Sequence, residues 1–503
     1  MRFPPATDTK IAQIEQFWQD YRSGLPIPQV IASASDSLGE VAVDVVICGG
    51  TLGLLVGTAL QQRGFSTLIL ERGRLQGREQ EWNISRAELH NLLEVELLTP
   101  EELAKTIVTA YSPGRVGFYG GGEYWVKDVL DLGVSPRILL DLLKHKFLAL
   151  GGQIRENSPF TRAVVHPDGV LVEAGGSYSA RLLLDCMGYF SPIGRQTRYH
   201  LYGQDRPDAI CWVVGGCATG INPCSWGDVL YTFTPIEDYY QYFWEAFPAF
   251  DGRTTYLFTY GDLHRERGGM KELWSAYCRL LPQYQDTDPR EIKFHRVLGG
   301  FFPAYRTNPL APAWDRVLSL GDSGGYQSPL SFSGFGAMVR HLPRLVQALT
   351  EAIGGNYLSR PDLGYVQPYQ PNIAVTWLFQ TVMRVEMGEK REPNGVNRIL
   401  DLVFRQMSQL DPQVMRTFLQ DVVQFPALTQ TLVRMLWADP GLIAQVVAQV
   451  GVGAVLDWFR HYLGLGLYEV LQNLPPGQDF RAKRRWEGWS FGSGHDRVLS
   501  QLD

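Results

Sequence analysis

Residues 45–71 constrain the fold of this chain more than any other part of the sequence. The apolar run Val45-Val-Ile-Cys48 predicts a buried parallel strand, and glycines follow it directly at positions 49, 50 and 53. A helical pattern over residues 54–63 then leads to a second apolar strand that closes on Glu71. This order predicts the first βαβ unit of a dinucleotide-binding fold.

The small and polar residues of this unit have separate tasks in binding a dinucleotide. Gly50, with Gly49 beside it, lets the backbone approach a pyrophosphate at the helix N-terminus, and Gly53 lets the helix pack against the strand. Glu71 can hold a ribose hydroxyl. The pattern departs from G-x-G-x-x-G at its first position, which is Cys48. The alternative is a structural turn without a ligand, but the strand, the helix and the distant acid together favour a nucleotide site.

Composition limits the class of ligand. The 503 residues are 19% charged, 45% hydrophobic and 12% aromatic, with a formal net charge of −6. Nucleic acid is disfavoured because it requires a basic surface, whereas a large apolar cavity or a lipid-facing surface suits this balance. The six cysteines form no C-x-x-C pair and the histidines have no metal-ligand spacing. We therefore expect reduced thiols and no metal site.

Three regions are predicted along the chain. Residues 1–40 hold a short helix and a linker, residues 41–365 form an α/β domain for cofactor and substrate, and residues 366–503 are helical with a basic tail. Strand patterns predict an antiparallel sheet inserted on the substrate side of the α/β domain, at residues 210–214, 240–247 and 254–260.

A second glycine cluster, at residues 215–220, also follows a strand pattern. Cys217 stands where the backbone would meet phosphate, and Pro223 prevents the next segment from continuing into a helix. We therefore predict no second dinucleotide site there. A nicotinamide reductant such as NADPH would then bind only transiently.

A strand over residues 316–320 ends in Gly321-Asp322, and Gly334 and Gly336 then open a helix over residues 337–353. FAD monooxygenases and geranylgeranyl reductases have a similar segment, in which the aspartate contacts the flavin ribityl chain and the helix N-terminus faces the flavin ring. The resemblance implies an FAD-binding Rossmann-like α/β domain of the glutathione-reductase type. Taken alone, Gly-Asp after a strand is more often an ordinary helix-capping turn.

Two further positions bear on the flavin hypothesis. The strand ending near Asp185 resembles the one that returns to the cofactor in the same enzymes. Their usual Asp-Gly is Met187-Gly188 here, so only Gly188 carries over. Pro136 stands where many relatives place a phosphate-binding arginine, which leaves open the cation that neutralises the pyrophosphate.

Several segments together resemble the lycopene cyclases of the CruA/CruP type, found in cyanobacteria, green sulfur bacteria and plastids, and the CruP branch most closely. The resemblance covers roughly residues 40–475 and is carried by residues 48–53, 79–86, 242–249, 253–256 and 327–336. It implies bound FAD, which must be reduced, and a lycopene-like carotenoid. The implied reaction cyclises a linear ψ end group to a β-ionone ring without net redox change.

Such a cyclisation needs a proton donor in an apolar pocket, where desolvation keeps a carboxyl protonated near neutral pH. Glu245 is the candidate catalytic residue. Aromatic residues, whose faces can stabilise a passing cation, surround it on a predicted strand: Tyr242, Phe243, Trp244 and Phe247. The alternative is a glutamate on the polar face of an amphipathic strand. Glu79 and Glu81 are weaker candidates, expected at the surface or near the cofactor.

Three functions fit these observations. The first is a carotenoid-modifying flavoenzyme resembling lycopene cyclase. The second is a redox flavoenzyme, either a monooxygenase or a reductase, that acts on a carotenoid or prenyl lipid. The third is a non-catalytic protein that binds flavin or carotenoid.

The C-terminal region also carries a membrane signal. The uncharged run at residues 441–456 is too short and too polar to span a bilayer, but with Trp458 and the basic cluster at 481–485 it suits contact with a membrane surface. Packing within a helical subdomain is the alternative. The N-terminus lacks the apolar stretch of a signal peptide. We expect a peripheral protein on the cytoplasmic side of a membrane, associated with thylakoids.

Overall fold

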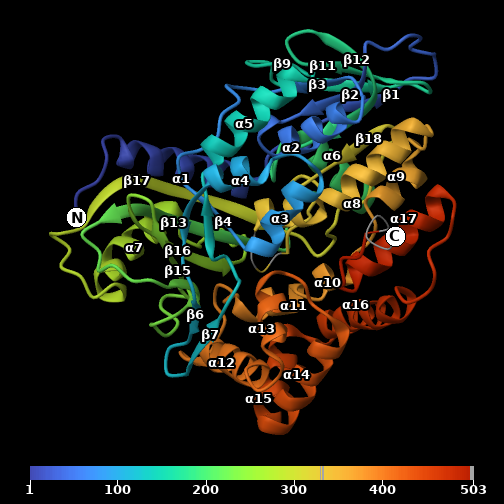
Figure 1. Cartoon of the computed structure of the whole chain (residues 1–503). Coiled ribbons are helices and arrows are strands. Elements are labelled where there is room, and N and C mark those ends of the chain that lie inside the picture. Colours follow the sequence, from blue (N-terminus) through green and yellow to red (C-terminus); the bar gives the residue numbers. More distant parts are fainter. Residues whose placement is uncertain (329, 331–332, 499–503) are drawn as a thin grey trace.

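The computed structural model describes residues 1–328, 330 and 333–498. The chain forms two large sheets, one small sheet and a layer of helices towards the C-terminus. In Figure 1 one large sheet lies at the top, the other lies at the left, and the C-terminal helices lie below and to the right. The predicted α/β architecture with a helical C-terminal region is confirmed at this level.

The first sheet contains eight strands, which are β1 (Ile31–Ser33), β2 (Val43–Cys48), β3 (Thr67–Leu70), β9 (Gln153–Arg155), β10 (Arg162–Val165), β11 (Val170–Glu173), β12 (Ser177–Asp185) and β18 (Val317–Ser319). Their order is β1-β10-β11-β12-β2-β3-β9, and β18 pairs with β12. Strands β18, β12, β2, β3 and β9 run parallel, whereas β11 is antiparallel to both neighbours. The carboxyl ends of the parallel strands therefore meet at one edge.

The predicted βαβ unit is β2, helix α2 (Gly50–Gln62) and β3. Strand β2 is buried on both faces, as parallel strands are. Val45 and Ile47 pack in the core that contains α2, while Val46 and Cys48 pack in the core on the opposite face. Helix α2 begins at Gly50, four residues before the predicted start, because the glycine turn itself adopts helical geometry.

Gly53 brings α2 close to β2. A Cβ at this position would lie 2.7 Å from Ile47 Cγ2. Gly53→Ala should therefore lower the free energy of unfolding by about 1–3 kcal/mol through overpacking. Gly364→Ala is the matched control, because that helical glycine has no atom within 4 Å of the added Cβ. Urea denaturation measures both, and equal midpoints for the two variants would contradict a packing role for Gly53.

The second sheet contains seven strands, which are β6 (Gly114–Gly117), β7 (Glu123–Val126), β13 (Ala209–Thr219), β14 (Gly227–Tyr231), β15 (Phe243–Ala249), β16 (Gly252–Gly261) and β17 (Lys293–Ala304). Their order is β17-β13-β16-β15-β14-β6-β7. All neighbours are antiparallel except β14 and β6, which run parallel. The antiparallel prediction is therefore right for the three predicted strands and wrong for the β14–β6 pair. One face packs on helices α1 (Thr7–Gly24) and α7 (Met270–Tyr284).

The second glycine cluster lies in strand β13. A Cβ at Gly215 would lie 2.2 Å from the Thr255 carbonyl oxygen, and one at Gly216 would lie 2.4 Å from that of Arg296. These glycines let neighbouring strands approach closely. The segment is thus part of a ladder and forms no nucleotide turn.

A small sheet and four helices complete the α/β part, namely β4 (Trp82–Ile84), β5 (Ile107–Ala110), β8 (Leu132–Val134), α3 (Arg86–Glu94), α4 (Pro100–Thr106), α5 (Pro136–Ala149) and α6 (Pro192–Tyr202). The remaining helices are α8 (Gly334–Gly354), α9 (Arg360–Val366), α10 (Pro371–Ala374), α11 (Trp377–Met383), α12 (Gly395–Met407), α13 (Pro412–Leu419), α14 (Phe425–Ala438), α15 (Pro440–Val450), α16 (Val452–Leu471) and α17 (Phe480–Gly492). Helices α11 to α13 cover the second face of the seven-stranded sheet through one apolar core.

Candidate active site

A cavity of about 880 Å³ extends from the carboxyl ends of β2 and β3 to the face of the seven-stranded sheet. Glu71 and the glycine turn line one end, and residues of β15 and β16 line the other. In open parallel sheets, ligands bind beyond the carboxyl ends of the strands, which is where this cavity begins. It also brings together residues predicted from separate parts of the sequence.

The glycine turn has a shape that larger residues would disturb. Gly49 has φ of 98°, and a Cβ there would lie 2.3 Å from the Cys186 carbonyl oxygen. The Gly50 N–H donates to Glu71 Oε2 at 2.8 Å, and the Gly73 N–H donates to Glu71 Oε1 at 3.1 Å. The N-cap residue of α2 is Gly49, which has no side chain, and Glu71 accepts only the first N–H of the helix. The helix dipole at the remaining N–H groups is available to an anion in the cavity.

A second helix N-terminus reaches the cavity at the start of α8. Gly321, with φ of 60°, turns the chain after β18, and Asp322 follows beside Gly334. A Cβ at Gly334 would lie 2.0 Å from Asp322 Oδ1, so only glycine leaves room for this carboxyl. Gly336 lies in the first turn of α8, where a Cβ would lie 2.9 Å from Ser333 Oγ. Residues 329, 331 and 332 of this predicted segment lie outside the described part.

The Asp322 carboxyl is buried, and its Oδ1 has no hydrogen-bond partner among the described residues. Burial raises the pKa of this carboxyl to about 7, while the positive charge of Arg78 acts to lower it. A buried polar atom without a partner carries a free-energy cost. Asp322 is therefore suited to accept or donate a hydrogen bond to a ligand in the cavity.

The loop after β12 forms another wall of the cavity. Gly188 has φ of 81° and open space where a Cβ would stand. Asp185 fixes this loop, accepting hydrogen bonds from Ser191 Oγ at 2.6 Å, Ser319 Oγ at 3.0 Å and the Met187 N–H at 3.0 Å. Burial raises the pKa of Asp185 to about 6.

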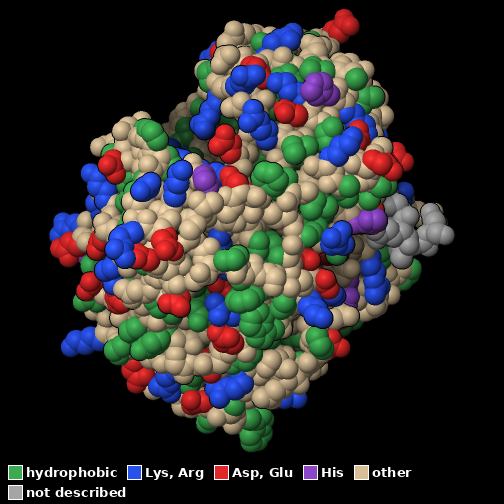
Figure 2. All heavy atoms as spheres, turned by 60° about the vertical axis from the view of Figure 1, so that its left-hand side comes forward, with side chains coloured by type: hydrophobic (Ala, Val, Ile, Leu, Met, Phe, Trp, Pro, Cys, Tyr) green, Lys and Arg blue, Asp and Glu red, His purple; other side chains and the backbone are tan. Residues whose placement is uncertain are grey.

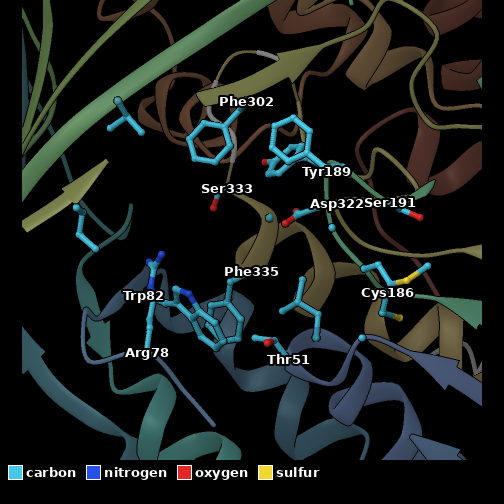
Figure 3. A pocket seen from close by; sticks show the side chains of 18 of the residues that line it. Thr51, Arg78, Trp82, Cys186, Tyr189, Ser191, Phe302, Asp322, Ser333 and Phe335 are labelled. Atoms are coloured by element: carbon cyan, nitrogen blue, oxygen red, sulfur yellow. The ribbon is translucent and has the colours of Figure 1, made fainter. Parts of the chain in front are cut away.

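Aromatic rings form two sides of the cavity. Trp82 and Phe335 stack with their centroids 4.4 Å apart, and Tyr189 and Phe302 lie 5.0 Å apart. Figure 3 shows the two pairs on opposite sides, with Asp322 between them. Flat aromatic walls suit a planar ring system.

The cations of this cavity were not predicted from the sequence. Arg72 and Arg78 both line it, and Arg78 points into it in Figure 3. Pro136, which replaces the arginine of many relatives, lies against the same loop, since a Cβ at Gly77 would lie 2.2 Å from its carbonyl carbon. The run of arginines at 72, 74 and 78 directly after Glu71 was the available signal.

Glu245 lies at the far end of the large cavity on strand β15. Burial raises the pKa of its carboxyl from 4.5 to about 8, and no described residue forms a hydrogen bond with it. Phe247 lines the same cavity. Tyr242 and Trp244 instead pack in the core with α7, so only part of the predicted aromatic set surrounds Glu245.

A second, apolar cavity of about 70 Å³ adjoins Glu245. Both cavities share Leu130, Glu245, Phe258, Leu330 and Ser333, and the second is lined further by strand β14, by helices α11 to α13 and by the loop after them. Its apolar lining includes Leu230, Phe379, Met383, Val403, Phe404 and Phe418. Asp421, which was not considered from the sequence, is a second carboxyl on this cavity.

The two other candidate acids are less suitable. Glu81 is buried in an ion pair with Arg296 at 3.2 Å and accepts a hydrogen bond from Gln80 at 2.8 Å. Glu79 is exposed. Glu245 is therefore the acid of the three with an apolar surrounding and a free carboxyl facing a cavity.

Solved structures with this fold include several flavoproteins. The halogenase PltM in complex with phloroglucinol and FAD is 14% identical, covers 76% of this chain and 83% of its own, and has a TM-score of 0.54. A geranylgeranyl bacteriochlorophyll reductase-like protein from Thermoplasma acidophilum is 12% identical, covers 84% and 99%, and has a TM-score of 0.53. A variant of the flavin-dependent brominase Bmp2 is 14% identical, covers 78% and 98%, and has a TM-score of 0.53.

No protein-family model and no curated protein matches the chain. At these identities the structural matches show only that the chain shares the fold of these proteins. They do not extend to the CruA/CruP family in particular.

Proposed function

We propose that this protein binds FAD in the large cavity. The glycine turn, Glu71 and the N-terminus of α2 would hold the adenosine diphosphate half, with Arg72 and Arg78 as the cations near the diphosphate. Asp322 would contact the ribityl chain, and the N-terminus of α8 would favour negative charge on the ring. The unpartnered Asp322 Oδ1 supports this fit, because a ribityl hydroxyl would satisfy it.

We further propose a redox flavoenzyme that acts on an apolar lipid such as a carotenoid or prenyl chain. FAD supplies electron transfer to or from carbon, or activation of oxygen, when it is bound. The observation that carries the proposal is the apolar cavity that opens from the far end of the large cavity, at Glu245 and Phe258. The small cavity, of about 70 Å³, would take only the tip of a hydrocarbon, whose remainder would lie in the large cavity next to the flavin. A nicotinamide or another reductant would bind transiently.

Acid-catalysed cyclisation is a second candidate, favoured by Glu245 and by the resemblance to CruA/CruP-type lycopene cyclases. A carboxyl with a pKa near 8 is protonated at neutral pH and can deliver a proton to an alkene. Phe258 and Tyr260 also line the cavity and could stabilise a carbocation with their ring faces. The reaction would leave the mass of the substrate unchanged.

Product mass separates these candidates. Purified protein would be loaded with FAD, reduced anaerobically and incubated with lycopene, and the products would be analysed by chromatography and mass spectrometry, with a parallel incubation in air. A gain of two mass units indicates reduction, a gain of sixteen in air indicates oxygenation, and an isomer of equal mass indicates cyclisation. Binding of flavin and carotene without turnover would favour the third, non-catalytic function.

Asp322→Ala should weaken FAD binding at least about tenfold, because a hydrogen bond to a charged group contributes about 1.5–3 kcal/mol. The variant should stay folded, since the substitution removes a polar group and little core volume. Fluorescence quenching during FAD titration gives the affinity, and thermal melting of the apoprotein serves as the control. Unchanged affinity for FAD would mean that Asp322 only shapes the turn before α8 and does not contact the cofactor.

A further inference from the structure

Helix α16 exposes a continuous apolar face, here called the α16 stripe. Its members recur at intervals of three and four residues and are each between 46% and 68% exposed: Val452, Leu456, Phe459, Leu463, Leu467 and Val470. At a rise of about 1.5 Å per residue the stripe is about 27 Å long. Water-exposed helix faces are normally polar, so an apolar face of this length indicates a binding surface.

The charged residues of α16 lie beside the α16 stripe. Asp457 lies 3.9 Å from His461, but burial lowers the pKa of this histidine, so the imidazole is neutral and Asp457 keeps its negative charge, while Glu469 contacts His495 at 3.0 Å. Arg460 is exposed and has no ion-pair partner among the described residues. The solvent side of α16 therefore presents mainly hydrocarbon, with the charges of Asp457 and Arg460 beside it.

Helix α14 adds to this surface. It packs against α16 through a hydrogen bond between Thr429 and Tyr462 at 2.7 Å. Val433, Leu436 and Trp437 are exposed on it, Trp437 to 85%, together with a second cation, Arg434. In Figure 2 a small hydrophobic group protrudes at the lower end of the molecule, with charged side chains close by; α14 and α15 occupy this end in Figure 1.

We propose that the α16 stripe, with the exposed end of α14, docks on the surface of a bilayer that contains anionic lipid. Among the described residues no single helix is long and apolar enough to cross a membrane, and α15 and α16 pass that test only as a pair bent by 105°. An apolar helix face flanked by cations and tryptophan is the pattern of a helix that lies in the interface. Arg434 and Arg460 would meet lipid phosphates.

Charge favours a bilayer over a second copy of this chain. A symmetric contact places the same patch on both partners, so the exposed cations Arg434 and Arg460 would be enclosed between two surfaces that both carry them. Anionic headgroups instead provide opposite charge. The buried faces of α14 and α16, through Leu428 and Leu465, belong to the apolar core that also lines the cavity beside Glu245.

Vesicle flotation tests the proposal with the full chain. The wild type should float with phosphatidylcholine vesicles, and more completely when they contain phosphatidylglycerol. The triple variant Leu456→Asp, Leu463→Asp, Leu467→Asp should lose at least about tenfold in vesicle affinity, because it places charge where the apolar face must enter the interface. Arg434→Gln with Arg460→Gln should lose only the preference for anionic vesicles.

The matched control changes three exposed apolar residues at α5, a helix that packs with α2 on the first sheet and takes no part in the α16 stripe, by Ile138→Asp, Leu148→Asp and Leu150→Asp. This variant should float like the wild type, and circular dichroism should show all variants folded. Equal flotation of the stripe variant and the wild type would overturn the proposal. So would a wild type that ignores vesicles and forms a dimer that the stripe substitutions dissociate. Neither result depends on bound FAD, so the test is independent of the proposed function.

Discussion

Glu245→Gln should slow the turnover of a linear carotene by about 10²–10⁴-fold, the usual contribution of general acid catalysis. Both cyclisation and the reduction of a double bond require a proton on carbon, and the amide cannot supply it. The variant keeps the shape of the side chain, so FAD content and flavin reduction should be unchanged. Oxygenation needs no such proton. A Glu245→Gln variant that oxygenates the carotene at the wild-type rate would therefore indicate monooxygenase chemistry.

Glu81→Gln is the matched control for this prediction. It makes the same chemical change at a buried glutamate, but one that is already paired with Arg296. Turnover measured by chromatography should fall much further for Glu245→Gln than for Glu81→Gln. The reverse order would move the acid to Glu81 and remove the main support for cyclisation.

The raised pKa of Glu245 also fixes the direction of the pH dependence. Wild-type turnover should fall as the pH rises through about 8, where the carboxyl loses its proton. Between the ordinary pKa of 4.5 and about 8, the folded protein holds a proton that the unfolded chain has released. The contribution of this group to stability therefore declines as the pH rises through that window, and Glu245→Gln should lack that decline.

Much of the nucleotide-binding half could be predicted because its signals are local. The strand, the glycines and the acid of the βαβ unit lie within residues 45–71, and each follows from backbone conformation or burial. The start of α2 was placed late because a helical turn that contains Gly50 and Gly53 has little helical pattern. The same local logic correctly rejected residues 215–220 as a nucleotide turn.

The substrate side could be predicted only in part because long-range packing forms it. Glu245 was selected for its aromatic neighbours in the sequence, but strand alternation turns Trp244 towards α7. The apolar cavity beside Glu245 depends on Phe404 and Phe418, more than 150 positions later in the chain. No spacing rule connects such residues. Arg78 was missed for a related reason, since a loop arginine usually points to solvent.

Glu71→Lys should abolish FAD binding, the largest effect expected on the cofactor. The Glu71 carboxylate accepts N–H groups from Gly50 and Gly73 and lies at the cavity wall beside the glycine turn. Lysine removes both acceptor oxygens. It also places a cation where the ribose hydroxyl needs a hydrogen-bond acceptor. The hydrogen bond from the ribose hydroxyl to the Glu71 carboxylate contributes about 1.5–3 kcal/mol, and the lysine adds disturbance of the turn, so the loss in affinity should exceed about a hundredfold.

Glu79→Lys is the control for Glu71→Lys, because it makes the same change of charge at an exposed acid nearby in the sequence. Flavin absorbance retained after gel filtration should be close to wild type for Glu79→Lys and absent for Glu71→Lys, with both variants folded by circular dichroism. A Glu71→Lys protein that keeps its flavin would mean that the cofactor does not use the βαβ turn. The large cavity would then belong to the substrate alone, and the assignment of Asp322 and the α8 N-terminus to a flavin would fail with it.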